Sequence, residues 1–131
     1  MTKEMNSGPV EYVSAMGFML TVERLTRAIE GAGMNIFARI DHAAGARSSG
    51  LAMPPSLVLI YGNPLGGTPI MRHSPLAGLE LPLRVLVREA EDGRAIVAFH
   101  PVVPMLRRVG VPDDLSARLE PAQRLLIKEI T

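Results

Sequence analysis

The stretch Ser56-Leu57-Val58-Leu59-Ile60-Tyr61 is an almost continuous apolar run, and the cluster Gly62-Asn63-Pro64-Leu65-Gly66-Gly67 follows it at once. A short apolar run that is bounded by glycine and proline is typical of a strand rather than a helix. Because the run does not alternate between apolar and polar residues, we expect a central strand that is covered on both faces. Residues 56–61 therefore set the centre around which the other elements are arranged.

Upstream of this strand, apolar residues recur at steps of four and three. They are Phe18, Val22, Leu25, Ile29 and Ala32. This period predicts an amphipathic helix, which Gly31 and Gly33 end. Residues 34–41 then have strand character, and Asp41 is a plausible N-cap for a short second helix over residues 41–46. A short strand over residues 9–14 precedes the long helix.

Downstream, Thr68-Pro69 predicts the start of a short helix that runs to His73. Residues 81–88 and 95–99 read as strands, and Glu91-Asp92-Gly93 between them is a hairpin turn.

After a short helix or turn over residues 101–109, Asp113-Asp114 is expected to cap the last helix, in which Pro121 predicts a kink or a restart. Helices on one face of a mainly antiparallel sheet make an α+β fold, with the long N-terminal helix and the C-terminal helix packed on the sheet.

The composition excludes several classes of protein. The chain has 131 residues, 47% of them hydrophobic and 21% charged, with a net charge of +1 and no cysteine. Disulfide frameworks and thiol chemistry are therefore ruled out, and so is a disordered polyelectrolyte. We expect one domain over residues 1–131, with a flexible segment over residues 1–8.

The longest uncharged segment, residues 48–71, has the length of a membrane span but contains four prolines and four glycines. A spanning helix is therefore not expected. Residues 1–9 lack the apolar stretch of a signal peptide, which predicts a soluble cytoplasmic protein without a membrane partner. The positive charges are interspersed, so we also expect no nucleic-acid partner.

Four segments together resemble the bacterial domain of unknown function 302. They are Leu25 to His42 around the Ile40-Asp41-His42 step, Leu57 to Pro64, Gly67 to Met71, and Gly78 to Val87 with its Leu81-Pro82-Leu83 strand. The resemblance covers about residues 16–131. Two positions depart from the family pattern, since Glu80 stands where Asp is common and Arg88 where an aromatic residue is frequent.

The resemblance implies a TATA-binding-protein-like α+β fold, in which a sheet grips a long helix, and it implies homodimers. It implies neither DNA binding nor an established activity, because one fold supports unrelated functions.

The Asp41-His42 pair is the first candidate for chemistry. A carboxylate beside an imidazole can orient a general base or supply two metal ligands. Equally, Asp41 can cap the helix while His42 occupies its first turn. Both interpretations remain open from the sequence.

The three histidines form the second candidate. Zinc accepts three imidazoles and a water molecule, so His42, His73 and His100 make a conceivable metal site. Their spacing has no metal-binding signature, and three separate surface or half-buried imidazoles are the alternative. The eight methionines are dispersed, which favours core filling over copper binding.

The third candidate is a crevice between Asp41-His42 and Asn63-Pro64, both predicted near ends of strands. There His42 and Asn63 would supply polar contacts, and Tyr61 or Met71 an apolar wall. The leading hypothesis is a binding or interaction module that takes a small ligand in this crevice. The alternatives are a small enzyme with an Asp41-His42 acid/base pair and a histidine-based metal-binding accessory protein. The sequence leaves open whether the protein is an enzyme and names no cofactor.

Overall fold

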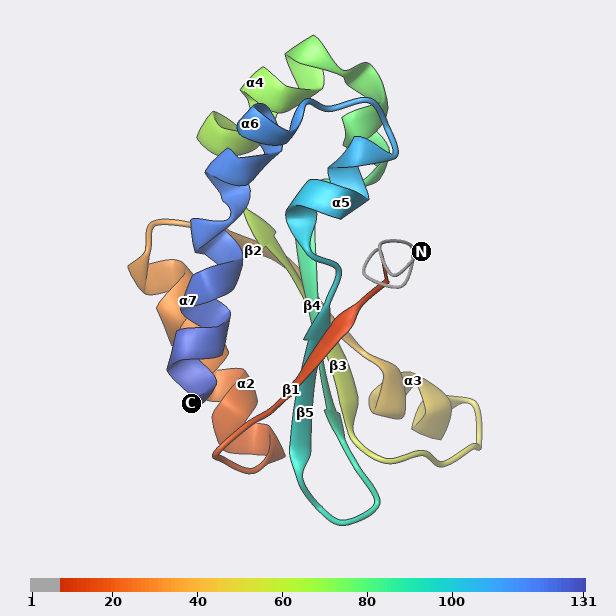
Figure 1. Ribbon diagram of the computed structural model, residues 1–131. Helices are drawn as coiled ribbons and strands as arrows, with labels where there is room; N and C mark the ends of the chain where they lie inside the picture. The colour runs from red at the N-terminus through yellow and green to blue at the C-terminus, as the bar shows by residue number, and fades with distance from the viewer. Residues whose placement is uncertain (1–7) are drawn as a thin grey trace.

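A computed structural model describes residues 8–131 and contains one five-stranded antiparallel sheet in the order β1-β5-β4-β3-β2 (Figure 1). The strands are β1 (Val10–Val13), β2 (Asn35–Asp41), β3 (Ser56–Gly62), β4 (Leu83–Glu89) and β5 (Ala95–Phe99). The expected flexible segment 1–8 lies, apart from Gly8, outside the described residues. The predicted strands and the hairpin between residues 89 and 95 are confirmed.

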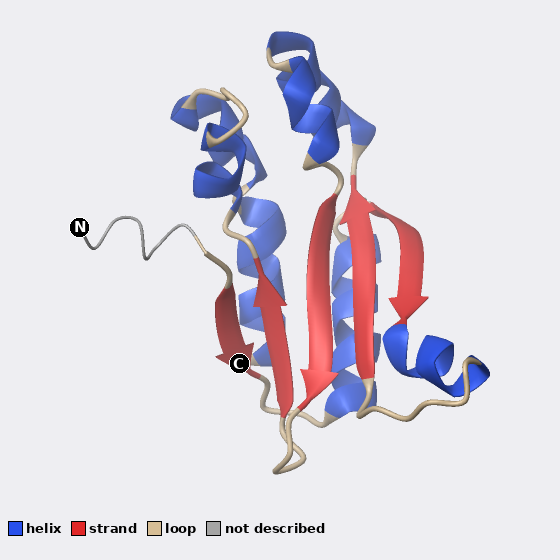
Figure 2. Cartoon of the chain, turned by 90° about the vertical axis from the view of Figure 1, so that its right-hand side faces the viewer, coloured by secondary structure: helices blue, strands red, loops and turns tan. Residues whose placement is uncertain are grey.

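Helical segments connect and cover the strands. They are α2 (Phe18–Gly31), α3 (His42–Ser48), α4 (Pro64–His73), η1 (Pro75–Leu79), α5 (Val102–Arg107), α6 (Asp113–Ser116), η2 (Ala117–Leu119) and α7 (Pro121–Ile130). Helices α2 and α7 lie side by side behind the sheet, while its other face is open toward the viewer in Figure 2. The α+β arrangement of a long N-terminal helix and a C-terminal helix on one sheet face is confirmed.

The core lies between the sheet and these two helices. The predicted stripe of α2 buries Val22, Leu25 and Ile29, and α7 buries Leu126 and Ile130 against the same strands. Burial of one such side chain contributes about 1.5–3 kcal/mol.

Helix α2 ends as predicted, because Gly33 adopts a φ of 83° that other residues rarely reach. This end positions β2 for pairing with β3.

Strand β3 is covered less evenly than its sequence predicts. Leu57, Leu59 and Tyr61 are buried beneath the helices, whereas Val58 and Ile60 on the open face are only half-buried. The expectation of two covered faces is therefore wrong for the open face. A continuous apolar run cannot distinguish a strand under two layers from one whose outer side chains merely pack against neighbouring strands.

Two predicted helix starts are also wrong. Helix α4 begins at Pro64, because the Asn63 side chain accepts a hydrogen bond from the Leu65 N–H at 2.9 Å and caps it; Pro69 lies inside the helix. At α6 the cap residue is Pro112. Asp113 instead receives two hydrogen bonds from Arg107, at 3.1 and 2.8 Å, which lower the pKa of the Asp113 carboxyl. The restart at Pro121 is confirmed, since α7 begins there.

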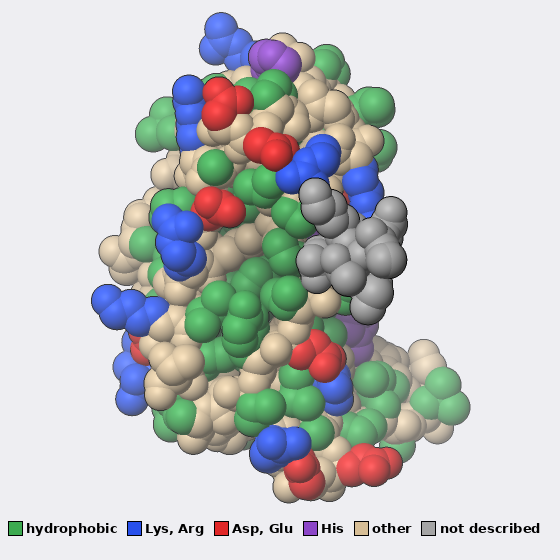
Figure 3. Space-filling model, in the orientation of Figure 1, with side chains coloured by type: hydrophobic (Ala, Val, Ile, Leu, Met, Phe, Trp, Pro, Cys, Tyr) green, Lys and Arg blue, Asp and Glu red, His purple; other side chains and the backbone are tan. Residues whose placement is uncertain are grey.

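None of the helices in residues 8–131 has the length and apolar character of a membrane span. On the face seen in Figure 3, hydrophobic side chains gather between α7 and β1, and charges of both signs are scattered around them.

Candidate functional site

A cleft opens where β4 and β5 separate. The two strands pair from Glu89–Ala95 only as far as Leu86–Ala98. Beyond that point β4 continues with β3 as far as Leu83, and β5 continues with β1 as far as Phe99. The sheet is therefore split at this end, and we call the opening the β4–β5 cleft.

Gln123 of α7 stabilises the split. Its side-chain amide donates a hydrogen bond to the His100 carbonyl at 2.8 Å, and its side-chain oxygen accepts one from the Val102 N–H at 2.9 Å. Backbone groups that are removed from water need hydrogen-bond partners. The His100 carbonyl and the Val102 N–H bond to the Gln123 side chain instead of to the backbone of β4. Gln123 is itself buried and lines the cleft.

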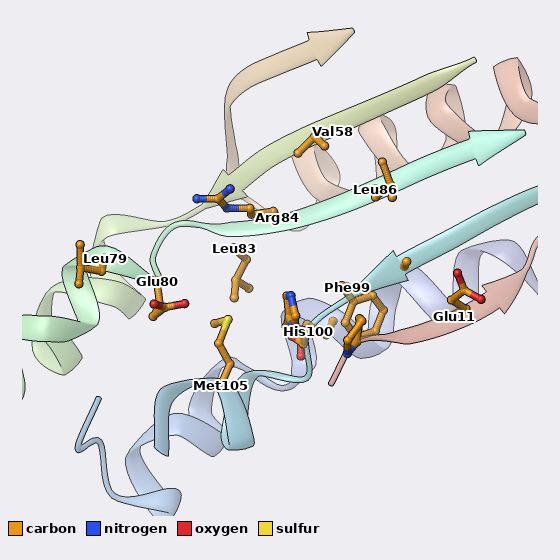
Figure 4. A pocket seen from close by; sticks show the side chains of 13 residues that line it. Glu11, Val58, Leu79, Glu80, Leu83, Arg84, Leu86, Phe99, His100 and Met105 are labelled. Carbon is orange, nitrogen blue, oxygen red and sulfur yellow. The ribbon is translucent and has the colours of Figure 1, made fainter. Parts of the chain in front are cut away.

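The β4–β5 cleft has a volume of about 800 Å³. Its apolar lining comes from Val58, Leu79, Leu83, Leu86, Phe99 and Met105. Figure 4 shows Leu83 on the β4 side, Phe99 and His100 on the β5 side, and Met105 of α5 pointing toward Leu83. Side chains of five elements, β3, η1, β4, β5 and α5, thus form a broad apolar floor of the cleft.

The charged residues of the cleft are not equivalent. Glu11 forms an ion pair with Arg88 at 3.3 Å. By contrast, Arg84 and Glu80 lie at the same end of β4 (Figure 4), and neither side chain forms a hydrogen bond or an ion pair with any described residue. Arg84 is exposed and Glu80 half-exposed. A guanidinium group over an apolar floor is suited to an anion that carries an apolar group.

Asp41 and His42, the predicted catalytic or ligand-binding pair, lie at the junction of β2 and α3. The Asp41 carboxylate accepts a hydrogen bond from the Ala44 N–H at 2.9 Å, so Asp41 does cap the helix. His42 is exposed in the first turn. Neither residue lines the β4–β5 cleft.

Asn63, Tyr61 and Met71 lie at the other end of β3. Asn63 holds the Leu65 N–H and donates to the Gly33 carbonyl at 3.3 Å, so both its polar groups are used by the fold. The Tyr61 hydroxyl donates to the Ala122 carbonyl at 2.8 Å, and burial raises the pKa of this phenol.

Met71 and Asn63 line a second, smaller cavity of about 130 Å³, which we call the Met-lined pocket. Its wall consists of Met34, Gly62, Asn63, Gly67, Met71, Leu81, Pro82, Leu83, Leu119 and Ala122.

The expected crevice between Asp41-His42 and Asn63-Pro64 is not one place in the structure. Asp41 pairs with Leu57 at the start of β3, whereas Asn63 follows Gly62 at its end. At about 3.3 Å per residue, the two are separated by roughly 20 Å along the strand. Both pairs do lie near ends of strands, as expected, but the antiparallel pairing of β2 with β3 puts the two strand ends at opposite ends of the strand pair.

The three histidines lie on different elements. His42 begins α3, and His100 follows β5 at the cleft. His73 ends α4, and its ring is hydrogen-bonded to the Ser74 hydroxyl at 2.9 Å. Residues 8–131 contain no group of three or more His, Asp or Glu side chains that could hold a metal ion.

Arg84 was missed as a site residue from the sequence, although a signal was present. Arg84 interrupts an otherwise apolar strand, Leu83-Arg84-Val85-Leu86-Val87, at a position that faces away from the helices. A charged residue in a mostly apolar strand indicates that one face of the sheet is open to solvent. Such a residue is a candidate for ligand binding when no neighbouring side chain neutralises its charge.

Comparison with known proteins identifies the family. The chain matches the family described as "Domain of unknown function DUF302" over residues 10–130. In its fold it is similar to an uncharacterized conserved DUF302 protein from Bacillus stearothermophilus, with a TM-score of 0.84 at 17% identity, over 94% of this chain and 98% of that one.

Proteins named "Fluoride-specific ion channel FluC" from Brucella also match. FluC 1 of Brucella suis is 33% identical over 120 residues, which are 90% of this chain and 47% of that protein; FluC 1 of Brucella abortus gives the same identity over 44% of its length. The chain thus spans about half the length of these curated relatives. With the family matched over nearly the whole sequence, the chain belongs to the DUF302 family of domains of unknown function.

Proposed function

We propose that this protein is a small-molecule binding module and that the β4–β5 cleft holds its ligand, an organic anion. The observation that carries the proposal is Arg84, which no described residue neutralises, at the rim of an apolar cavity of about 800 Å³. A cavity of this size, with an apolar floor and a limited set of polar side chains (Glu11, Glu80, Arg84, His100 and Gln123), falls in the range of small-molecule sites.

The charge arrangement supports an anionic ligand. Glu11 is paired with Arg88, so Arg84 and Glu80 are the charged side chains that remain open to a ligand, and Arg84 is the one that can bind an anion. Arg84 donates in a planar fork that fits a carboxylate through two parallel hydrogen bonds. The apolar floor then favours a carboxylate with a hydrocarbon part over an inorganic anion, because burial of that part removes apolar surface from water.

The test is calorimetric titration with butanoate and benzoate. Arg84→Gln should weaken both by about tenfold or more, since a hydrogen bond to a charged group contributes about 1.5–3 kcal/mol. Arg47→Gln is the matched control, because Arg47 is exposed on α3 and outside the cleft. No binding of any carboxylate by the unmodified protein, or equal binding by Arg84→Gln, would overturn the proposal.

Fluoride is a second candidate ligand, because the matching Brucella proteins are named fluoride-specific ion channels. A bare halide would use Arg84 but leave the apolar floor in water. Titration of sodium fluoride against sodium chloride, with Arg84→Gln beside the unmodified protein, separates the two ligands. Fluoride binding that requires Arg84 and is not displaced by butanoate would favour this second function.

We further propose that the module is a soluble, cytoplasmic homodimer. Support for dimerisation comes from edge strand β2, which among the strands of residues 8–131 pairs only with β3 and leaves Phe37 and Ile40 51% and 42% exposed. Unpaired strand edges with exposed apolar residues favour association with another chain.

A further inference from the structure

We propose that the ligand of the β4–β5 cleft is a linear aliphatic carboxylate, whose carboxylate binds Arg84 and whose chain enters the Met-lined pocket. The inference rests on the proposed function, because the cleft must first bind an organic anion. It adds the chemical class of the ligand and assigns a role to a second cavity.

The two cavities share a wall. Leu83 lines both of them. Two pairs of neighbouring residues also belong to both cavities, one residue to each. Glu80 lines the cleft and Leu81 lines the pocket. In the same way, Gln123 lines the cleft and Ala122 lines the pocket. Leu83 points to the helix-covered face of the sheet and Arg84 to the open face, yet both line the cleft, so the cleft passes from one face to the other where β4 and β5 part. A ligand that Arg84 binds on the open face can therefore extend through the split toward Leu83 and the shared wall.

The Met-lined pocket is suited to hydrocarbon. Its polar member, Asn63, has both side-chain groups hydrogen-bonded to the backbone, at 2.9 and 3.3 Å, so the fold already engages its amide. Met34 and Met71 supply flexible thioether side chains that adapt to an irregular apolar guest. A pocket lined in this way favours an apolar guest, because binding removes apolar surface from water.

The shared wall predicts a dependence of affinity on chain length. Each methylene that moves from water into the pocket should tighten binding about fourfold, which corresponds to about 0.8 kcal/mol per CH₂. The affinity should therefore rise through butanoate, hexanoate and octanoate, and level off once the pocket of about 130 Å³ is full.

A glycine in the pocket wall allows a precise test of the tail site. A Cβ at Gly67 would lie 3.7 Å from both the Leu81 Cδ1 and the Met71 Cε, which is ordinary contact, so Gly67→Ala should fold normally and reduce the free volume. Gly45→Ala is the matched control, because Gly45 is also helical and its Cβ would meet nothing within 4 Å.

The methionine methyl groups provide a direct readout by ¹³C NMR. Octanoate should shift the methyl signals of Met34 and Met71 in the pocket and of Met105 in the cleft, whereas butanoate should shift only Met105. Met19 and Met53, which are 81% and 44% exposed outside both cavities, should not move with either ligand.

The experiment combines titrations of the acid series with these spectra on the unmodified protein and the three variants Gly67→Ala, Gly45→Ala and Arg84→Gln. We expect Gly67→Ala to weaken octanoate about fourfold or more and to leave butanoate unchanged, while Gly45→Ala changes neither. Arg84→Gln should weaken every acid.

The two proposals fail in different ways. Arg84-dependent binding without any gain from butanoate to octanoate, or without shifts of Met34 and Met71, would overturn the tail site and leave the anion site standing. A chain-length gain that Arg84→Gln and Gly67→Ala both leave intact would indicate adsorption to exposed apolar surface, and absence of all binding would overturn both proposals.

Discussion

The Tyr61 hydroxyl joins the central sheet to the start of α7. It donates to the Ala122 carbonyl at 2.8 Å, and Tyr61→Phe should lower the free energy of unfolding by about 1 kcal/mol at neutral pH. Because burial raises the pKa of Tyr61, the folded state keeps its proton where the unfolded state loses it. The stabilisation is therefore full below the ordinary tyrosine pKa of about 10 and is lost as the pH rises above it.

Urea unfolding at neutral and at alkaline pH checks this prediction. The stability gap between the unmodified protein and Tyr61→Phe should narrow at high pH, and a gap that stays constant would contradict it.

Asp41 and His42 are adjacent, yet they are expected to contribute unequally to the stability of the fold. Asp41→Ala removes the cap of α3 and should cost about 1 kcal/mol, whereas His42→Ala changes an exposed side chain and should cost less than about 0.5 kcal/mol. Thermal unfolding of the two variants measures both effects. If His42→Ala instead abolishes binding of a carboxylate, the Asp41-His42 pair, and not the β4–β5 cleft, is the functional site.

Among the elements, helix α2 agrees best with the sequence, because its apolar period predicts which of its side chains are buried. Leu25 is fully buried, and Leu25→Ala should destabilise the protein by about 2–5 kcal/mol because it leaves a cavity against the sheet. Leu20 on the same helix is 43% exposed, so Leu20→Ala is the matched control and should cost much less. Denaturant melts of the two variants compare them directly; equal losses would mean that the face of α2 is assigned wrongly.

Helix starts were predicted less well than helix faces, because a single side-chain hydrogen bond decides where a helix begins. Both Thr68-Pro69 and Asn63-Pro64 have the composition of a cap followed by proline, and the hydrogen bond from Leu65 to Asn63 decides between them. Asp113 was likewise expected to cap, but Arg107 six residues earlier binds its carboxylate. Side-chain partners of this kind depend on the tertiary arrangement, which local sequence does not contain.

At the scale of the whole molecule, the order of elements and the helix-covered face followed from the sequence, and the site did not. Antiparallel register places Asp41 and Asn63 at opposite ends of β3, and the register is a property of two strands together. The β4–β5 cleft depends on where pairing stops, at Leu86–Ala98, and on the bonds of Gln123 to the chain after β5. Nothing in either strand alone marks that point.

The open edge of β2 leads to a prediction about assembly. If Phe37 and Ile40 lie at a dimer interface, the protein should sediment at about twice its 14.1 kDa chain mass, and Phe37→Glu with Ile40→Glu should return it to the monomer, since buried like charges would face each other across the interface. Leu65→Glu is the control, because Leu65 is 84% exposed on α4. A 14.1 kDa species for the unmodified protein at micromolar concentration would reject the dimer. A dimer that survives the double substitution would place its interface elsewhere, with the open sheet face and its cleft as the next surface to examine.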